Sequence, residues 1–249
     1  METEMTPELA EVCGIHAGDG YLRGPDKRRE LDISGSIEEQ EYYNNHVVPL
    51  FEKAFDLKIN AKFFPGRNTY GFVIRNKEAI TKMHDFGFPY GAKSTIVSAP
   101  KKVLNSKNKE VKCMFLRGLF DTDGCLHFLK RNYGKYGIFK STREYYPRIA
   151  IRIVSKKLFQ DICTLLTNLG FNYYSNNYQP KSPNFNYCYG IYLSGTGNLE
   201  KWIQNIGFKN SCKLSRYSVW KEHGFCPANL SFEQRKQILN KQIDPNSFY

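Results

Sequence analysis

The chain has 249 residues, of which 41% are hydrophobic and 24% charged, a composition typical of a folded globular protein and not of a disordered one. Lys and Arg number 36 against 24 Asp and Glu, so the formal net charge is +12 and the surface attracts polyanions such as nucleic acid or an anionic membrane. No run approaches the roughly 20 apolar residues that a membrane helix needs, so a membrane protein is not expected.

The first predicted element is an apolar, helix-like stretch over residues 9–20 that ends in Asp19-Gly20. Gly14 lies five residues before this aspartate. The elements after it are predicted from hydrophobic periodicity and turn residues. They are an extended segment over 30–34, a helix over 38–55, strands over 60–64 and 69–75 around a Pro-Gly-Arg-Asn turn, and a short helix over 77–86.

This first half ends on Gly87-Phe88, followed five residues later by Lys93. Residues 97–109 are rich in Lys, Asn and Ser and are predicted to be a linker. We therefore expect an N-terminal half over 1–104, a C-terminal half over 105–224, and a tail over 225–249. The tail is predicted to carry one more helix, because Ser231 and Gln234 have the spacing of a capping box.

The second half repeats the first at about a hundred residues' distance. It opens with an apolar stretch over 114–124 that ends in Asp123-Gly124, again with a glycine, Gly118, five residues before the aspartate. The later elements are a strand over 147–154, a helix over 156–169 capped by Ser155, strands over 172–178 and 186–193 around a turn at 180–183, and a short helix over 197–206. The second half ends on Gly207-Phe208 and Lys213. The element order αββαββα therefore occurs twice, and an α+β fold is expected.

On these residues the chain resembles the LAGLIDADG homing endonucleases in their two-motif, single-chain form, which is monomeric. The resemblance covers about residues 10–220 and rests on both motifs, the repeat order and both terminal lysines. It implies two pseudo-symmetric halves that pack through the two motif helices. Each half would present a curved antiparallel sheet, and the two sheets together would form a DNA-binding saddle.

Glycines in the motif helices suit such an interface. Gly14 and Gly18 are four apart and share one helix face, and Gly118 takes the same place as Gly14 on the second helix. Small residues let two helix backbones approach closely. We expect Gly20 and Gly124 to let the chain leave each helix through a tight turn, where a positive φ is open to glycine.

The resemblance implies that Asp19 and Asp123 meet at the ends of the two helices and bind metal. Two carboxylates beside a phosphate need divalent cations to neutralise them, and hard oxygen ligands suit Mg²⁺, with Mn²⁺ as a substitute. The backbone carbonyls of Gly18 and Thr122 would also face the metal. Such a cation lowers the pKa of an attacking water and stabilises the charge of the transition state.

Lys93 and Lys213 match the family's basic residues near the active sites, where they would help to orient water or hold the phosphate. The motifs differ at one position, since Ala17 stands where the second half has Asp121. That position is not the metal ligand, so we expect activity to survive. The family also places a polar residue near the start of the following helix, and the unassigned candidates are Glu38, Glu39, Gln40 and Lys156.

Basic residues are dense between 127 and 157, where the only acid is Glu144. Ile149, Ile151 and Ile153 alternate with Arg148 and Arg152, so the arginines are predicted to face outward from the sheet. Arginine can bind guanine in two-pronged fashion, while lysine mostly neutralises phosphate. The expected DNA-binding residues are Arg23, Arg28, Lys62, Arg67, Arg75, Lys130, Arg131, Lys140, Arg143, Arg148, Arg152 and Lys156.

The seven cysteines include no C-x-x-C pair, so free thiols are expected. A zinc site on Cys212, His223 and Cys226 would lack a fourth ligand. Residues 1–9 are acidic and polar, unlike a secretion signal, so an intracellular protein of the cytoplasm or an organelle is expected.

The expected function is sequence-specific cleavage of double-stranded DNA at a long site, which by resemblance leaves four-base 3′ overhangs. Two alternatives stay open. One is a maturase that uses the same fold to bind intron RNA, and the other is a DNA-binding regulator without catalysis. The presence of both aspartates and both lysines favours an active enzyme.

Overall fold

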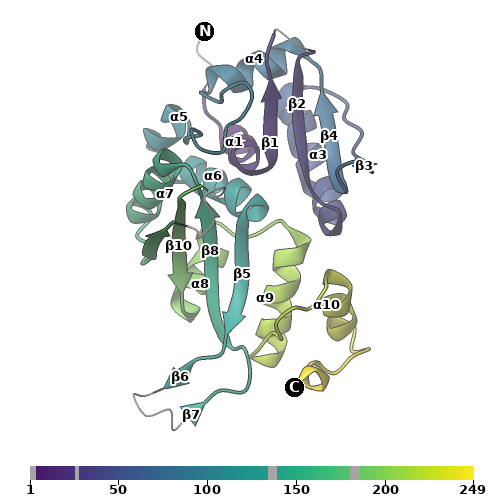
Figure 1. Cartoon of the computed structure of the whole chain (residues 1–249), viewed down its shortest axis with the longest axis vertical. Coiled ribbons are helices and arrows are strands. Elements are labelled where there is room, and N and C mark those ends of the chain that lie inside the picture. The colour runs from purple at the N-terminus through teal and green to yellow at the C-terminus, as the bar shows by residue number, and fades with distance from the viewer. Residues whose placement is uncertain (1–3, 26–27, 134–138, 180–185) are drawn as a thin grey trace.

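The computed structural model describes residues 4–25, 28–133, 139–179 and 186–249, with the backbone alone for 132, 133, 139 and 140. It contains two halves that follow one another along the long axis of the molecule, each with a four-stranded antiparallel sheet (Figure 1). The α+β class and the two pseudo-symmetric halves are confirmed. No helix in the described ranges is long and apolar enough to cross a membrane.

The first half opens with α1 (Pro7–Asp19), which Thr6 caps by accepting a hydrogen bond from the Leu9 amide at 3.2 Å. Its sheet has the order β1-β2-β4-β3. The strands are β1 (Gly20–Arg23), β2 (Glu30–Ser36), β3 (Lys62–Phe64) and β4 (Thr69–Ile74). The expected helix over 38–55 is present as one helical run of η1 (Ile37–Glu39), α2 (Gln40–Tyr42), the π-helical η2 (Tyr43–Val47) and α3 (Val48–Phe55), and α4 (Lys77–Asp85) follows β4.

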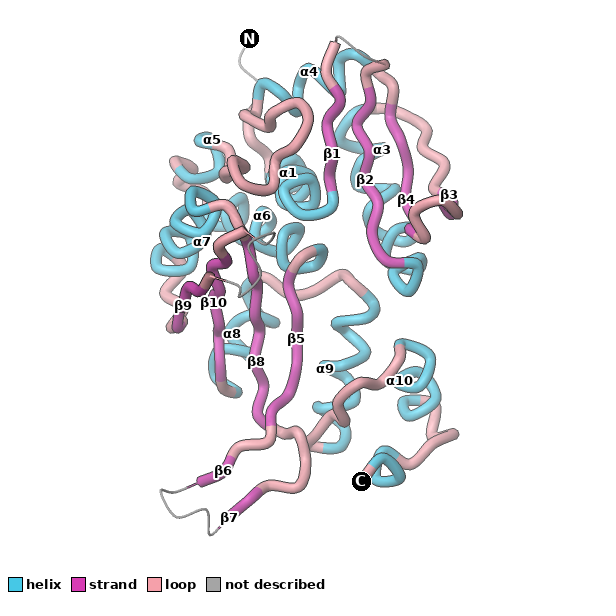
Figure 2. The backbone as a smooth tube through the Cα atoms, viewed as in Figure 1, coloured by secondary structure: helices cyan, strands magenta, loops and turns pink. Residues whose placement is uncertain are grey.

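The second half opens with α6 (Lys109–Thr122), and its sheet has the matching order β5-β8-β10-β9. The strands are β5 (Gly124–Leu129), β8 (Tyr146–Ile153), β9 (Tyr174–Tyr178) and β10 (Cys188–Ser194). The helices are α7 (Lys156–Asn168), capped by Ser155 as expected, and α8 (Thr196–Asn205). A ribbon of β6 (Asn132–Tyr133) and β7 (Phe139–Lys140) extends beyond the sheet (Figure 2). The turn expected at 180–183 lies outside the described residues.

The two sheets share one register as well as one order. The matching pairs are Gly20 with Ile33 and Ile33 with Phe72 in the first sheet, and Gly124 with Ile151 and Ile151 with Ile191 in the second. One face of each sheet is apolar and buried beneath helices, as the alternating burial along β2 and β8 shows. The other face, called the outward face below, carries the polar side chains.

Several local expectations were incomplete or wrong. The order αββαββα includes a strand directly after each motif helix, and β1 and β5 take that place, although sequence periodicity gave no residue range for them. Sequence periodicity missed α9 (Ser211–His223), which has no counterpart directly after Lys93 in the first half. The linker contains a short helix, α5 (Lys101–Leu104). In the tail, α10 (Phe232–Leu239) has the expected capping box, and η3 (Pro245–Phe248) follows it.

The positive φ that glycine allows is not used after either motif helix. Gly20 has φ −82°, and Gly124 is not among the glycines with positive φ. Close contact is what excludes a side chain here, because a Cβ on Gly20 would lie 2.0 Å from the His16 ring nitrogen Nδ1. Positive φ occurs instead at Gly87 and Gly207, which open the two Gly-Phe segments with φ 101° and 73°.

Helices α1 and α6 contact each other at the centre of the molecule, between the two sheets (Figure 1). A Cβ on Gly14 would lie 2.1 Å from the Phe115 carbonyl oxygen, and one on Gly118 would lie 2.4 Å from that of Glu11. Any side chain at either glycine would push the two backbones apart. The contact therefore depends on glycine at both positions.

A buried ion pair joins the same two helices. The Glu11 carboxylate accepts hydrogen bonds from Arg117 Nε at 2.8 Å and Arg117 Nη2 at 2.5 Å, and it contacts His46 Nε2 at 2.7 Å. Burial opposes the ionisation of Glu11, but the hydrogen bonds from His46 and Arg117 hold its pKa below the ordinary value. If the helices shifted apart, Glu11 would be left as a buried charge without a partner, which is costly. The pair therefore fixes how α1 and α6 pack against each other.

Gly14→Ala is expected to lower the free energy of unfolding by about 3 kcal/mol or more, because the new methyl group meets backbone atoms that cannot turn aside. Urea denaturation followed by circular dichroism measures the change. Gly197→Ala in α8 is the matched control, since nothing lies within 4 Å of its Cβ position. Equal stability of the two variants would show that the close contact between α1 and α6 is not required.

Candidate functional site

The two motif aspartates lie where α1 and α6 end. Asp19 is the last residue of α1, and Asp123 is the C-cap of α6. The helix ends are in contact, because a Cβ on Gly18 would lie 2.1 Å from Thr122 Oγ1 and 3.2 Å from Asp123 Cγ. The structure thus brings Gly18, Asp19, Thr122 and Asp123 to one place.

The carboxylate of Asp19 lies among polar groups of the first half. It accepts a hydrogen bond from the Tyr43 hydroxyl at 2.7 Å. A Cβ on Gly35 would lie 2.6 Å from Asp19 Oδ2 and 2.8 Å from Glu39 Oε2, so these two carboxylates flank the same glycine. Burial raises the pKa of Asp19 to about 7; the Tyr43 hydrogen bond opposes this, and the charges of Asp123 and Glu39 add to it.

Asp123 lines a pocket on the outward face of the second sheet. The pocket has a volume of about 340 Å³ and is lined also by Cys125, His127, Arg148, Ala150, Ile151, Arg152 and Tyr192. Burial raises the pKa of Asp123, although Lys93 and Lys213 lower it. The same pocket holds His127, whose pKa is lowered by burial and by neighbouring arginines.

The two terminal lysines make equivalent contacts in the two halves. Lys93 Nζ donates to the carbonyl oxygens of Ala17 at 2.8 Å and Gly18 at 2.6 Å. Lys213 Nζ donates to the carbonyl oxygen of Asp121, the residue that matches Ala17. Burial lowers the pKa of Lys93, while the charges of Asp123 and Asp19 raise it. Each lysine therefore brings a positive charge to the end of one motif helix.

Glu39 connects the two halves beside the aspartates. Its Oε1 accepts a hydrogen bond from Asn210 Nδ2 at 2.6 Å and lies 3.9 Å from Lys213 Nζ. Its other oxygen accepts from the Ser36 amide in a capping box. Of the unassigned polar candidates, the structure places Glu39 at the site.

Sequence reasoning missed Asn210 and Tyr43. Asn210 lies inside the second Gly-Phe-x-x-x-x-Lys segment, so the lysine's position was a usable signal for it. Tyr43 is fully buried in a helix, and such an aromatic residue is usually a core residue. Nothing in the sequence distinguishes its hydroxyl as a partner of Asp19.

Asp121 contacts the segment that carries Lys213. It is fully buried, and its Oδ2 accepts a hydrogen bond from the Lys209 amide at 2.7 Å. Burial raises its pKa to about 7, and Lys213 opposes the shift. Ala17 has no carboxylate and cannot form an equivalent contact in the first half. The two motifs therefore differ in how they hold the segments that carry Lys93 and Lys213.

The expected DNA-binding residues of the first half lie on or beside the outward face of the first sheet. Register places Arg23 and Lys62 at that face, and Arg75, just after β4, donates hydrogen bonds to Glu30 on it. Arg28 and Arg67 lie in the adjoining loops. Arg67 stacks on the Phe64 ring at 4.4 Å.

In the second half the expected residues are more scattered. Arg148 lines the pocket with Asp123 and also lines a further one, of about 330 Å³, with Lys130 and Arg131. Arg143 lies over the Phe225 ring of the tail at 4.7 Å. Lys156 is exposed at the start of α7, and the side chain of Lys140 lies outside the described residues.

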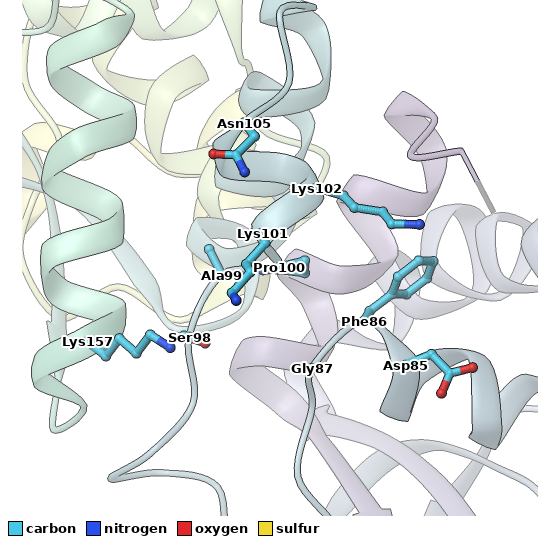
Figure 3. A pocket seen from close by; sticks show the side chains of 10 residues that line it. All are labelled: Asp85, Phe86, Gly87, Ser98, Ala99, Pro100, Lys101, Lys102, Asn105 and Lys157. Atoms are coloured by element: carbon cyan, nitrogen blue, oxygen red, sulfur yellow. The ribbon is translucent and has the colours of Figure 1, made fainter. Parts of the chain in front are cut away.

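A larger pocket, of about 590 Å³, lies away from the aspartates (Figure 3). It lies between the end of α4, the linker with α5, and the start of α7. Its lining includes Lys101, Lys102 and Lys157, and also Gly87, but none of the residues of the two motif helices.

The donor set at the aspartates is compatible with a hard divalent cation. The part of the chain that is described has no group of three or more His, Cys, Asp or Glu side chains arranged to hold a metal. Two carboxylates would therefore need oxygen ligands from the backbone, water or substrate, and Mg²⁺ commonly keeps such a mixed set. The Gly18 carbonyl, one expected ligand, accepts a hydrogen bond from Lys93.

Residues 110–207 match the family model described as LAGLIDADG-like domain. A curated relative, the replication factor C small subunit of Methanocaldococcus jannaschii, is 29% identical over 216 residues, or 86% of this chain. The chain spans only 10% of the length of that relative.

Solved structures of homing endonucleases share the fold over most of the chain. A mesophilic variant of the homing endonuclease I-DmoI matches with a TM-score of 0.53 at 16% identity, covering 80% of this chain and 95% of that one. I-DmoI in complex with DNA and Mn matches at 0.52 and 15%, covering 81% and 96%. A variant of I-SmaMI matches at 0.55 and 11%, covering 100% and 97%.

Asp19→Asn is expected to stabilise the metal-free protein at neutral pH. The folded-state pKa of about 7 lies above the ordinary 3.8, so the protonated form is favoured by folding. This stabilisation is present below pH 4 and is lost as pH rises through 7. The variant lacks the cost of ionising Asp19, so its advantage should grow from near zero at pH 4 to roughly 2 to 4 kcal/mol above pH 7.

Thermal unfolding in the presence of a chelator, measured at several pH values, tests this. Asp85→Asn is the matched control, because Asp85 is exposed at the end of α4. If the variant were no more stable than wild type at pH 7.5, ionisation of Asp19 would have no cost to the stability of the fold.

Proposed function

We propose that this chain, which carries a LAGLIDADG-like domain over residues 110–207 and has the fold of the LAGLIDADG homing endonucleases, is a metal-dependent endonuclease that cuts double-stranded DNA. The observation that carries the proposal is the meeting of Asp19 and Asp123 at adjacent helix ends, each with a lysine. The DNA complex of I-DmoI supports DNA as the partner.

The site has the charge pattern that phosphodiester hydrolysis needs. A divalent cation, when bound to Asp19 and Asp123, supplies a Lewis acid that activates water and offsets phosphate charge. Mg²⁺ is the proposed ion, with Mn²⁺ as a substitute; the structurally similar I-DmoI has been solved in complex with Mn or Ca and in the presence of Mg. The carbonyls of Gly18 and Thr122 are proposed further ligands.

Protein groups around the carboxylates have distinct proposed roles. Tyr43 orients Asp19 through its hydroxyl, and Glu39 lies close enough to hold a water beside that carboxylate. Lys93 and Lys213 are fixed by backbone carbonyls, so their charges are already in place when a phosphate arrives. Such preorganised charge is worth more than a mobile one, because it needs no rearrangement during the reaction.

The outward faces of the two sheets are proposed to hold the duplex, with the basic side chains on phosphates and bases. We propose that one chain cuts both strands as a monomer at a long site and leaves four-base 3′ overhangs. Domain limits of 1–104, 105–224 and 225–249 remain our proposal for the two halves and the tail.

Purified protein with Mg²⁺ should cut a small set of sequences from a randomised duplex library, and sequencing of the cut ends should identify the site and its overhangs. Asp19→Asn and Asp123→Asn should each lower the cleavage rate at least a hundredfold, because the cation loses a ligand. DNA binding by gel shift should persist in both.

Glu78→Gln in α4 changes the charge by the same amount away from the site and serves as the control. If the double variant Asp19→Asn/Asp123→Asn still cleaved DNA, the proposed metal site would be wrong. Binding of structured RNA with no cleavage of any duplex would favour a maturase instead.

A further inference from the structure

The pocket between α4, the linker and α7, called the linker pocket below, has no role in the proposed cleavage. Its volume is about 590 Å³, and its walls are the end of α4, linker residues between 98 and 105, and the start of α7 (Figure 3). Clefts of roughly 300 to 1,000 Å³ are the usual sites for small molecules. Neither Asp19 nor Asp123 lines it, so the proposed metal site does not account for it.

The linker pocket lies where the two halves of the chain differ. Ser36 caps η1 in the first half and Ser155 caps α7 in the second, so these two helix starts are matched positions. Lys213 lies in α9, and α9 packs against η1. Lys93 is followed instead by residues 94–100, which the structure describes as turn and loop. The pocket is therefore bordered by the element that matches η1, without a helix that matches α9 to cover it.

Lysines dominate the lining of this pocket. Lys101 and Lys102 lie in α5 and Lys157 lies in the first turn of α7, against one acid, Asp85. Among the residues that the structure describes, no acid lies within 4.0 Å of the ammonium group of Lys101 or Lys157. Figure 3 shows Lys157 reaching from α7 toward the linker, with Asp85 on the other side of the pocket. The linker and α7 therefore form a wall of positive charge.

This wall is held in place by hydrogen bonds between the linker and α7. Ser155 Oγ donates to the Val97 carbonyl oxygen at 2.6 Å, and the Ala99 amide donates to Asp161 Oδ2 at 2.9 Å. Burial raises the pKa of Asp161, and the Ala99 hydrogen bond and the charge of Lys157 oppose the shift. A ligand would meet a wall that is already fixed, which lowers the entropy cost of binding.

A phosphate-bearing ligand suits this lining. Lysine ammonium groups are compact charges that commonly bind phosphate. Lys101 and Lys157 come from different helices, so they can contact different oxygens of an oligophosphate. Ser98 and Asn105 add neutral side chains that can donate hydrogen bonds to it. Since Asp85 would repel an anion, the phosphates are expected against the linker and α7 and not against α4.

The linker pocket also borders both ends of the segment that carries Lys93. Residues 85–87 precede this segment and Ser98 follows it, and all of them line the pocket. The Lys93 carbonyl oxygen accepts hydrogen bonds from the amides of Ile96 at 3.0 Å and Val97 at 2.8 Å, so the turn after Lys93 leads directly to the pocket wall. A ligand would therefore contact both ends of the segment without entering the site of the aspartates.

We propose that the linker pocket binds a free oligophosphate, such as the triphosphate group of a nucleotide, through Lys101 and Lys157. Its binding joins α4 of the first half to the linker and to α7 of the second. This site is separate from the carboxylates at the helix ends, and its existence does not depend on the proposed endonuclease function.

Isothermal titration calorimetry of the metal-free protein with tripolyphosphate tests the site. Wild-type protein should bind one tripolyphosphate per chain. The double variant Lys101→Gln/Lys157→Gln should bind it about tenfold more weakly or worse, because two charged contacts are lost. Lys77→Gln/Lys221→Gln is the matched control, since it removes the same charge at two exposed lysines, at the start of α4 and near the end of α9. This control should bind as wild type does.

Two calorimetric results would overturn the inference. One is the absence of saturable binding by wild type, and the other is an equal loss in both double variants, which would show a response to net charge alone. Gel shifts with duplex DNA separate a free ligand from the duplex backbone. Lys101→Gln/Lys157→Gln should bind DNA as tightly as the control variant, and a weaker DNA complex would assign these lysines to the duplex and overturn the free ligand.

Discussion

The close contact between α1 and α6 is the constraint on which the rest of the molecule depends. Gly14 and Gly118 allow backbone atoms of one helix to lie where a side chain of the other would otherwise be. The buried Glu11–Arg117 pair then fixes the rotation of the helices about their contact. Because Asp19 and Asp123 follow at the ends of these helices, the packing that joins the halves also assembles the site.

This arrangement has an electrostatic cost in the absence of a cation. Burial and mutual repulsion raise the pKa of Asp19 and oppose its ionisation at neutral pH. Lys93 and Lys213 offset part of that cost, although the ammonium group of each donates hydrogen bonds to backbone carbonyls. The site is therefore suited to a cation, whose charge would balance the two carboxylates, bound together with a phosphate, whose charge the lysines would balance.

Much of this could be predicted from the sequence, because a duplication provides two independent copies of each signal. Asp19, Asp123, Lys93 and Lys213 stand at repeated positions, and the structure brings them together. Glu39 could not be singled out from Glu38, Gln40 and Lys156, because the sequence does not fix which residue of the helix after β2 faces the site. Tyr43 and Asn210 act through tertiary contacts that no local pattern specifies, and α9 was missed because only the second half contains it.

Our central proposal is that Asp19 and Asp123 together bind divalent metal where α1 and α6 end. Titration with Mn²⁺, followed by the electron paramagnetic resonance signal of the free ion, tests it most directly. Wild-type protein should remove Mn²⁺ from solution, and Asp19→Asn and Asp123→Asn should each weaken that uptake at least tenfold. Equal uptake by wild type and by the double variant would contradict the claim.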